Sequence, residues 1–143
     1  MTADEFFLQR FVDAQAPVYE DAVHALRGRT LDPRWMAFIF PRFVNCYHDP
    51  STHMFAIGSL DEARAYLAHP LLGPRMRESL AALEWLYDLD PDEMLSKTDR
   101  QNLHSSLTLF AEATSETLMR NMLALWFGCR ADEITMAQLD LRP

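Results

Sequence analysis

Apolar residues recur along this sequence at spacings of three and four, the period of helices that bury one face and expose the other. The clearest series are Met76, Leu80, Leu83 and Tyr87; Leu103, Ser106 and Phe110; and Leu118, Met122 and Leu125. Proline and glycine stand singly between such series, as they do between consecutive helices. The pattern predicts an all-α domain of about seven helices, packed against their neighbours through short connections.

The first predicted helix carries an amide on its apolar face. Thr2 and Glu5 have the spacing of an N-terminal capping box. The apolar face that follows consists of Leu8, Phe11, Val12 and Gln15. Pro17 then restarts the chain. A second helical series, for which Gly28 offers a left-handed C-cap, consists of Val18, Ala22 and Leu26.

The segment 34–40 has two interpretations. Asp32 and Pro33 are typical of the N-cap and first position of a short helix, which Pro41 would end. The apolar run within it also fits a buried strand, because periodicity does not separate the two at this length. We favour the helix, since no partner strand is evident.

Capping residues place a loop and two further helices. Residues 45–52 are rich in Asn, Asp, Pro and Ser and predict a loop. Ser59 and Glu62 form a second capping box, for a helix that ends near His69. Asp99 is predicted to be the N-cap of the helix that contains Leu103.

The composition predicts one soluble domain that spans residues 1–143. With 49% hydrophobic residues the chain is able to form a core. The longest apolar run, residues 35–41, is far shorter than the roughly 18 to 20 residues of a membrane-spanning helix. The first ten residues lack the features of a secretory signal, so we expect a cytoplasmic location. Cys46 and Cys129 are far apart in sequence and are expected to be reduced thiols. A disulfide between them is the alternative, which the distance between their Cα atoms decides.

The charge distribution narrows the class of ligand. A formal net charge of −8 argues against sequence-independent binding of nucleic acid, which needs lysine and arginine to neutralise phosphates. Between residues 27 and 42 the only acid is Asp32, whereas the arginines there are Arg27, Arg29, Arg34 and Arg42. An anionic ligand is therefore expected to prefer this region over residues 87–99, which hold five acids and one lysine.

Neither of two candidate metal sites is complete. The first, spaced like a calcium-binding loop, consists of Asp88, Asp90, Asp92 and Asp99. Glu93 stands where that loop needs glycine. The second, a set of zinc-type ligands in or beside a loop, consists of Cys46, His48 and His53. A structural zinc site needs a fourth ligand, so we predict no metal and no other cofactor.

The residue types of a nucleophilic triad occur together near the start of one helix, as Asp99, His104, Ser105 and Ser106. Adjacent helical residues point about 100° apart, so these side chains cannot form the hydrogen bond between nucleophile and base. We expect Ser106, on the apolar face, to bond to a helix carbonyl or to a neighbouring polar group. No catalytic arrangement is recognisable, which favours a role without catalysis and leaves an enzyme as an alternative.

Several stretches taken together resemble a widespread bacterial family. They are residues 10–15 with Tyr19; Trp35 and Met36 with residues 38–41; residues 62–67 with His69, Pro70, Leu72 and Gly73; and Ser105 and Ser106 with residues 108–110. This set of residues is similar to the domain of unknown function 1810 family, and the match follows nearly the whole chain in order. The resemblance implies a small multihelical domain and no established activity, cofactor or substrate.

The chain departs from the usual pattern of that family at five positions. Histidine, tryptophan, glutamine, lysine and arginine are usual where this chain has, respectively, Arg34, Ala37, Arg42, Asn102 and His104. The apolar frame is kept. The departures remove a large aromatic surface and change local charge, so they predict either a changed or a lost site.

The polar residues that remain in the apolar frame suggest a cleft. We predict a binding domain for a small polar or anionic ligand, whose site consists of Gln15, Tyr19, Arg34, Trp35, Arg42, Ser105, Ser106 and Thr108. The competing interpretation is that these groups satisfy one another in the core. An alternative function is protein–protein interaction or self-association through an exposed apolar patch that includes Phe6, Phe7, Trp85 or Trp126. A second alternative is an enzyme of unknown reaction.

Overall fold

The computed structural model describes residues 4–28, 39–43, 55–84 and 96–140. Within these ranges the helices are α1 (Gln9–Gln15), α2 (Tyr19–Arg27), α4 (Leu60–Ala68), α5 (Leu72–Glu84), α7 (Lys97–Ala113), α8 (Thr117–Phe127) and α9 (Glu133–Asp140). In the described ranges the β-type pairing is limited to an isolated bridge between Phe43 and Ile57. The prediction of an all-α domain with about seven helices is therefore confirmed.

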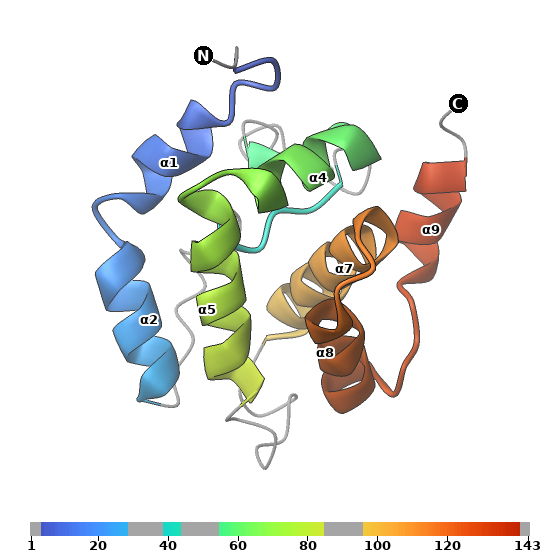
Figure 1. The fold of residues 1–143 in the computed structure, drawn as a ribbon. Coiled ribbons are helices and arrows are strands. Elements are labelled where there is room, and N and C mark those ends of the chain that lie inside the picture. The colour runs from blue at the N-terminus through green and yellow to red at the C-terminus, as the bar shows by residue number, and fades with distance from the viewer. Residues whose placement is uncertain (1–3, 29–38, 44–54, 85–95, 141–143) are drawn as a thin grey trace.

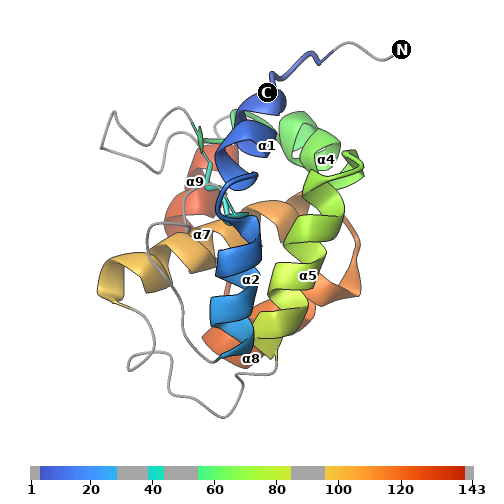
Figure 2. The ribbon, with the colours of Figure 1, turned by 90° about the vertical axis from the view of Figure 1, so that its left-hand side faces the viewer.

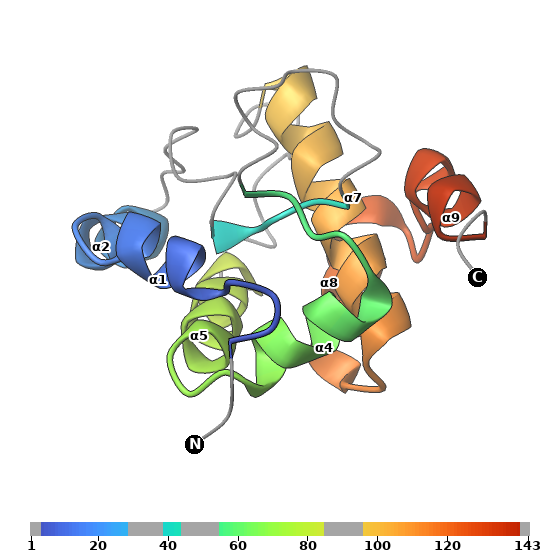
Figure 3. The same ribbon diagram turned by 90° about the horizontal axis from the view of Figure 1, so that it is seen from above.

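The N-terminal helices α1 and α2 lie on one side of the molecule and α9 on the other, with α4, α5, α7 and α8 between them (Figure 1). α2 packs on α5, α5 on α4 and α8, and α7 on α4, α8 and α9. Seen from above, α2 and α9 lie at opposite edges, and the segment 39–43 crosses between them (Figure 3). Turned by a quarter, the molecule shows α2 and α5 side by side in front (Figure 2). The long α7 thus has partners on several faces.

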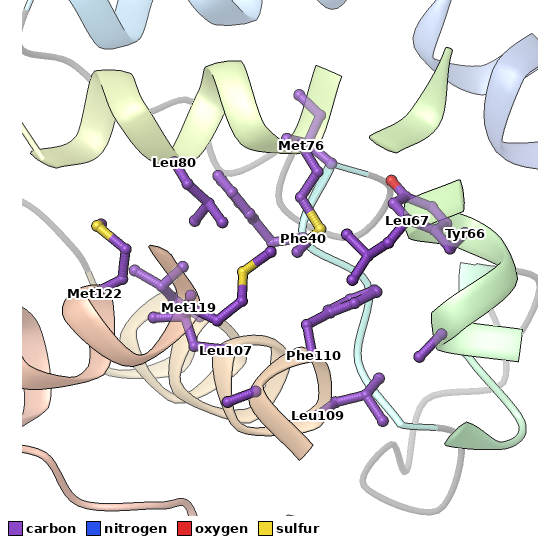
Figure 4. Packing of buried hydrophobic residues seen from close by; sticks show 14 of the residues in the cluster. Phe40, Tyr66, Leu67, Met76, Leu80, Leu107, Leu109, Phe110, Met119 and Met122 are labelled. Carbon is purple, nitrogen blue, oxygen red and sulfur yellow. The ribbon is translucent and has the colours of Figure 1, made fainter. Parts of the chain in front are cut away.

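Aromatic rings and methionines fill the space between α4, α5, α7 and α8 (Figure 4). The Tyr66 ring meets the Phe11 ring edge to face at 5.2 Å between centroids, and the Phe110 ring at 5.4 Å. Phe40, from the segment 39–43, lies between Met76 and Leu80 on one side and α7 and α8 on the other (Figure 4). This one core joins the N-terminal and C-terminal helices.

Helix ends follow the predicted capping residues in part. Ser59 is the N-cap of α4 and accepts from the Glu62 N–H, while the Glu62 carboxylate accepts from Gly58 N–H. Ser96, and not Asp99, is the N-cap of α7; its hydroxyl accepts from Asp99 N–H. Asp99 stands three positions after Ser96, where the backbone N–H commonly donates to the side chain of a serine N-cap.

One further prediction about a helix end needs correction. Gly28 ends α2 with φ of −85°, so it is not a left-handed cap. The left-handed position occurs at Gly128, the C-cap of α8, with φ of 60°. At the N-terminus the Asp4 carboxylate accepts from the N–H groups of Leu8 and Gln9, ahead of α1. These bonds lower the pKa of Asp4.

A buried ion pair fastens the start of the chain to α4. Arg10 donates from Nη2 to Glu62 Oε2 at 2.7 Å, and both side chains are largely buried. The same guanidinium donates to the carbonyl oxygens of Phe6, Phe7 and Ala56. These bonds supply side-chain donors to carbonyl oxygens that lie outside the helices.

The apolar face of α8 agrees with the prediction only in part: Met122 is buried and Leu118 packs against the core, but Leu125 does not. Leu125 is 48% exposed, whereas Trp126 is only 4% exposed and belongs to the core. The buried face of α8 is formed by Met119, Met122, Leu123, Trp126 and Phe127. Trp126 is therefore not part of an exposed apolar patch, for which it was one of four candidate residues. Phe7 is 63% exposed and Phe6 half-buried.

Some predictions lie outside the described residues. They concern most of the segment 34–40, the loop 45–52, residues 88–95 of the calcium-like loop, the zinc-type set Cys46, His48 and His53, and the side chains of Thr2, Trp85 and Tyr87. Among the helices that are described, none combines the length and the apolar character needed to cross a bilayer.

Candidate anion-binding groove

A groove of about 630 Å³ lies where the first half of α7 meets the C-terminal end of α8. The two helices are packed together in the fold (Figure 1). The described residues that line the groove are Lys97, Arg100, Gln101, His104, Trp126, Phe127, Gly128 and Arg130. Its volume is in the range of pockets that hold small ligands.

The groove is basic in an acidic protein. The chain has 13 lysines and arginines against 21 acids, yet three of the cations and a histidine line this groove. None of its described lining residues carries a carboxylate. Within the described part of the chain, Lys97 and Arg130 have no carboxylate within ion-pair distance. The local potential is thus opposite in sign to that of the whole molecule.

Phe127 anchors the basic side chains on the groove floor. The His104 imidazole stacks flat on the Phe127 ring, with 4.1 Å between centroids and 5° between planes. His104 Nε2 lies 2.6 Å from the carbonyl oxygen of Arg130, and a carbonyl only accepts, so Nε2 carries the hydrogen. The Arg100 guanidinium carbon lies 5.7 Å from the centre of the same ring. Two basic side chains are thereby held by contacts with one aromatic ring.

Trp126 supplies an unused donor beside these cations. Its ring is buried, and its indole N–H has no acceptor among the described residues. A buried donor without an acceptor costs roughly 1–3 kcal/mol, and native proteins seldom leave one. An oxygen of a bound ligand is one acceptor that would remove this cost.

A second hollow of similar size carries the opposite charge. It measures about 580 Å³ and lies between the N-terminal segment and the end of α4, with Asp4 and Glu5 among its lining residues. The two carboxylates disfavour an anion there. The basic groove is accordingly the better match to an anionic ligand.

Gln15 and Tyr19, predicted from the sequence as site residues, belong to a polar cluster around Tyr66 and Arg75. Gln15 Nε2 donates to the Tyr66 hydroxyl at 2.9 Å, and Arg75 Nη1 donates to Gln15 Oε1 at 3.5 Å. The Tyr19 hydroxyl donates to the Arg75 carbonyl at 3.4 Å, and the Arg75 guanidinium lies over the Tyr19 ring. Burial raises the pKa of Tyr66, and burial together with the Glu78 carboxylate raises the pKa of Tyr19 to about 12.

Ser105 and Thr108 contact the C-terminal part of the chain instead. The hydroxyls of Ser105 and Thr135 are 2.6 Å apart, and Thr108 Oγ1 accepts from Asp132 N–H at 2.8 Å. Thr108 also donates to the carbonyl of His104. These bonds join α7 to α9 and to the residue that precedes it, as the competing interpretation of satisfied core groups expects.

Arg42 and Ser106 lie on a third side of α7. Arg42 Nη1 donates to Asn102 Oδ1, and Ser106 follows Asn102 one turn later on the same helix face. The Ser106 hydroxyl is fully buried and has no hydrogen-bond partner in the described structure. Among the described residues, Ser106 therefore does not form the expected bond to a carbonyl or polar neighbour. Arg34 and Trp35 lie outside the described residues.

The contacts do not form a triad or a metal cluster. His104 bonds the Arg130 carbonyl and Ser105 bonds Thr135, so no described serine is paired with a base. In the described part of the chain no three residues of the types His, Cys, Asp and Glu are grouped as metal ligands.

The sequence contains a signal for the groove that the predictions did not use. Lys97, Arg100, Gln101 and His104 are spaced by three, one and three residues, which places them on one helix face. The predicted basic region was residues 27–42, and His104 was considered only as a triad residue and as a departure from the family pattern. The contribution of Arg130 depends on the turn after α8 and cannot be inferred from spacing.

Comparison with known proteins identifies the family. The family model described as "Protein of unknown function (DUF1810)" matches residues 5–139. The crystal structure of the conserved hypothetical protein Rv1873 from Mycobacterium tuberculosis is similar, with 38% sequence identity and a TM-score of 0.93, over 97% of this chain and 100% of that one. No curated protein sequence matches this chain. The chain therefore belongs to the DUF1810 family, whose function is unknown.

Proposed function

We propose that this protein is a binding domain for a small anion that carries carboxylate or phosphate groups, and that the groove between α7 and α8 is its site. The observation that carries the proposal is the collection of Lys97, Arg100, His104 and Arg130 around a buried indole donor, with no carboxylate among the described lining residues. The chain is otherwise strongly acidic, so this collection is not a sample of its average surface.

The chemistry of the groove supports an anion over a neutral ligand. Guanidinium and ammonium groups donate charge-assisted hydrogen bonds, which are about twice as strong as neutral ones. The floor formed by Trp126 and Phe127 is largely buried and apolar, which lowers the local dielectric and strengthens each charge interaction. The negative charge elsewhere on the molecule disfavours long polyanions, so the fit is to a compact or short ligand.

The ligand belongs to the small polar or anionic class expected from the sequence. The proposed site differs, because it is the groove between α7 and α8 and not the cleft around Gln15, Tyr19 and Trp35. The cleft around Gln15, Tyr19 and Trp35 stays a prediction, as does the cytoplasmic location. We favour binding over catalysis because the groove holds no pairing of a described nucleophile with a base.

Thermal unfolding with added anions tests the proposal. Sulfate, phosphate and citrate, each compared with sodium chloride at equal ionic strength, are expected to raise the midpoint of unfolding, because a ligand that binds only the folded state stabilises it. The double substitution Lys97→Gln and Arg130→Gln is expected to abolish the rise. Arg120→Gln is the matched control, since Arg120 is an exposed arginine of α8 that does not line the groove. Equal rises in all three proteins, or none in the wild type, would contradict the proposal.

Trp126→Phe tests the role of the indole donor separately. Phenylalanine keeps most of the apolar ring and removes the N–H that lacks an acceptor. We expect anion affinity to fall about tenfold, the effect of losing one hydrogen bond to a charged group. Unchanged affinity in this variant, with the Lys97 and Arg130 effect intact, would restrict the site to the cations.

A further inference from the structure

We infer that the groove takes an extended acidic peptide segment whose carboxylates are three residues apart, contributed by a partner protein. This inference rests on the proposed function and names the class of ligand. It follows from the length of the basic row, from the nature of the floor and from the amide of Gln101.

The basic groups are spread along the helix and are not gathered at one point. Lys97 and His104 are seven residues apart on α7, which corresponds to about 10 Å along the axis. Arg130 lies at the His104 end, because the Arg130 carbonyl oxygen bonds the His104 ring. A single phosphate or carboxylate therefore contacts one end of the row. A ligand that uses both ends needs two anionic groups on one face and about 10 Å apart. Side chains three residues apart meet this requirement in a chain extended as polyproline II, which has three residues per turn and rises about 3.1 Å per residue.

The apolar floor of the groove excludes nucleotides as the ligand. A nucleotide would need an open aromatic face for its base, and the imidazole of His104 already covers one face of Phe127. Trp126 is only 4% exposed, so its ring offers little surface for stacking. An extended peptide needs no such face, since small or apolar side chains between its acids can rest on the apolar floor.

Gln101 and Trp126 match a peptide backbone. Gln101 is exposed, lines the groove midway between Lys97 and His104, and its amide both donates and accepts. A peptide group presents the complementary donor and acceptor. The Trp126 indole N–H, without an acceptor in the described structure, matches a peptide carbonyl. A simple dicarboxylate would use the cations and leave the amide unused.

Fluorescence anisotropy with two labelled peptides of equal composition tests the inference. One peptide carries glutamates three residues apart in an alanine and serine background, and the other carries them adjacent. The spaced peptide is expected to bind about tenfold more tightly, because only it reaches both ends of the row. Lys97→Gln is expected to remove this preference, while Arg120→Gln, outside the groove, keeps it.

Alkylation of Cys129 reports where the peptide binds. It is exposed, and it lies in sequence between Gly128 and Arg130, both of which line the groove. A spaced peptide with a bromoacetyl group at one end is expected to alkylate Cys129 faster than the adjacent-glutamate peptide, with the site identified by peptide mapping. Free spaced peptide in excess is expected to slow this reaction.

The outcomes separate this inference from the proposed function. If sulfate and phosphate stabilise the wild type but the two peptides bind alike or not at all, the peptide inference is wrong and the anion groove stands. If neither the inorganic anions nor the peptides bind, both are wrong. A preference for the spaced peptide that survives Lys97→Gln would also overturn the inference.

Discussion

The amide of Gln15 on α1 donates a hydrogen bond to the hydroxyl of Tyr66 on α4, at 2.9 Å and out of contact with solvent. The Tyr66 ring in turn packs between Phe11 and Phe110, so the polar bond sits at the edge of an aromatic cluster. With the Arg10–Glu62 ion pair, this bond is one of the polar contacts that join α1 to α4. It also explains why an amide occupies the apolar face of α1.

Gln15→Leu is expected to destabilise the fold by roughly 1–3 kcal/mol, because the buried Tyr66 hydroxyl loses this donor. The double substitution with Tyr66→Phe is expected to recover most of the loss, since both ends of the bond are then apolar. Urea unfolding of the two variants and the wild type measures the difference. A double variant no more stable than Gln15→Leu alone would mean that the bond is not the reason for the amide.

Stability is expected to fall at alkaline pH because two tyrosines hold their protons more tightly in the fold. Burial raises the pKa of Tyr66 and raises that of Tyr19 to about 12, whereas tyrosine in an unfolded chain titrates near 10. Above pH of about 10 the unfolded chain releases protons that the folded one retains, so stability declines as pH rises. Below that pH the contribution is fully present.

Tyr66→Phe provides the comparison for this pH effect. The variant lacks one of the two shifted groups, so its free energy of unfolding should decline less steeply above pH of about 10, by about one proton in the slope. Chemical unfolding at several pH values measures the slope. Parallel curves for variant and wild type would contradict the assignment to Tyr66.

The Arg10–Glu62 ion pair is expected to be among the costly contacts to break. Glu62→Gln leaves a largely buried guanidinium without its carboxylate, for an expected loss of about 3 kcal/mol. Asp61→Asn is the matched control one residue away, because the Arg64–Asp61 pair is exposed and should contribute about 0–1 kcal/mol. Thermal or urea unfolding compares the two. Similar small losses in both would show that burial does not strengthen the pair.

Two of the departures from the usual family pattern contact each other, since Arg42 donates to Asn102. The family resemblance implies glutamine and lysine at these positions, so the pair would be an amide and a cation in relatives and is a cation and an amide in this chain. Asn102→Lys alone sets two cations side by side and should destabilise the fold, whereas Arg42→Gln with Asn102→Lys should restore stability. A coupling energy of roughly 0.5–3 kcal/mol is expected from the double-mutant cycle. If the effects of the two substitutions simply add, the two residues are not coupled and the pairing is wrong.

The sequence predicted the helices well because burial imposes a period. Leu103, Ser106 and Phe110 are all buried, as their spacing required. The prediction shifted on α8, where the sequence is apolar almost throughout and several faces fit equally. Leu125 then proved exposed, and Trp126 and Phe127 were selected by the packing of α8 on α7 and α5. Local spacing does not contain that tertiary choice.

The candidate site was harder to predict because polar residues on one helix can face different neighbours. Ser105, Ser106 and Thr108 are consecutive or nearly so, yet Ser105 and Thr108 bond residues before or within α9, while Ser106 lies on the face of Asn102. Shared membership of a helix did not imply a shared cavity. The groove, in turn, combines one face of α7 with a turn more than twenty residues further along the chain.

The groove lies where two helix ends with opposite partial charges border the same space. α7 begins at Lys97, with the positive end of its peptide dipoles, and α8 ends beside Gly128, with the negative end. These two contributions largely cancel, so the attraction for an anion originates in the charged side chains at the rim. Such charges are screened over about 8–10 Å in physiological salt. The fraction of the protein with an anion bound in the groove is therefore expected to rise at low ionic strength and to fall at high ionic strength.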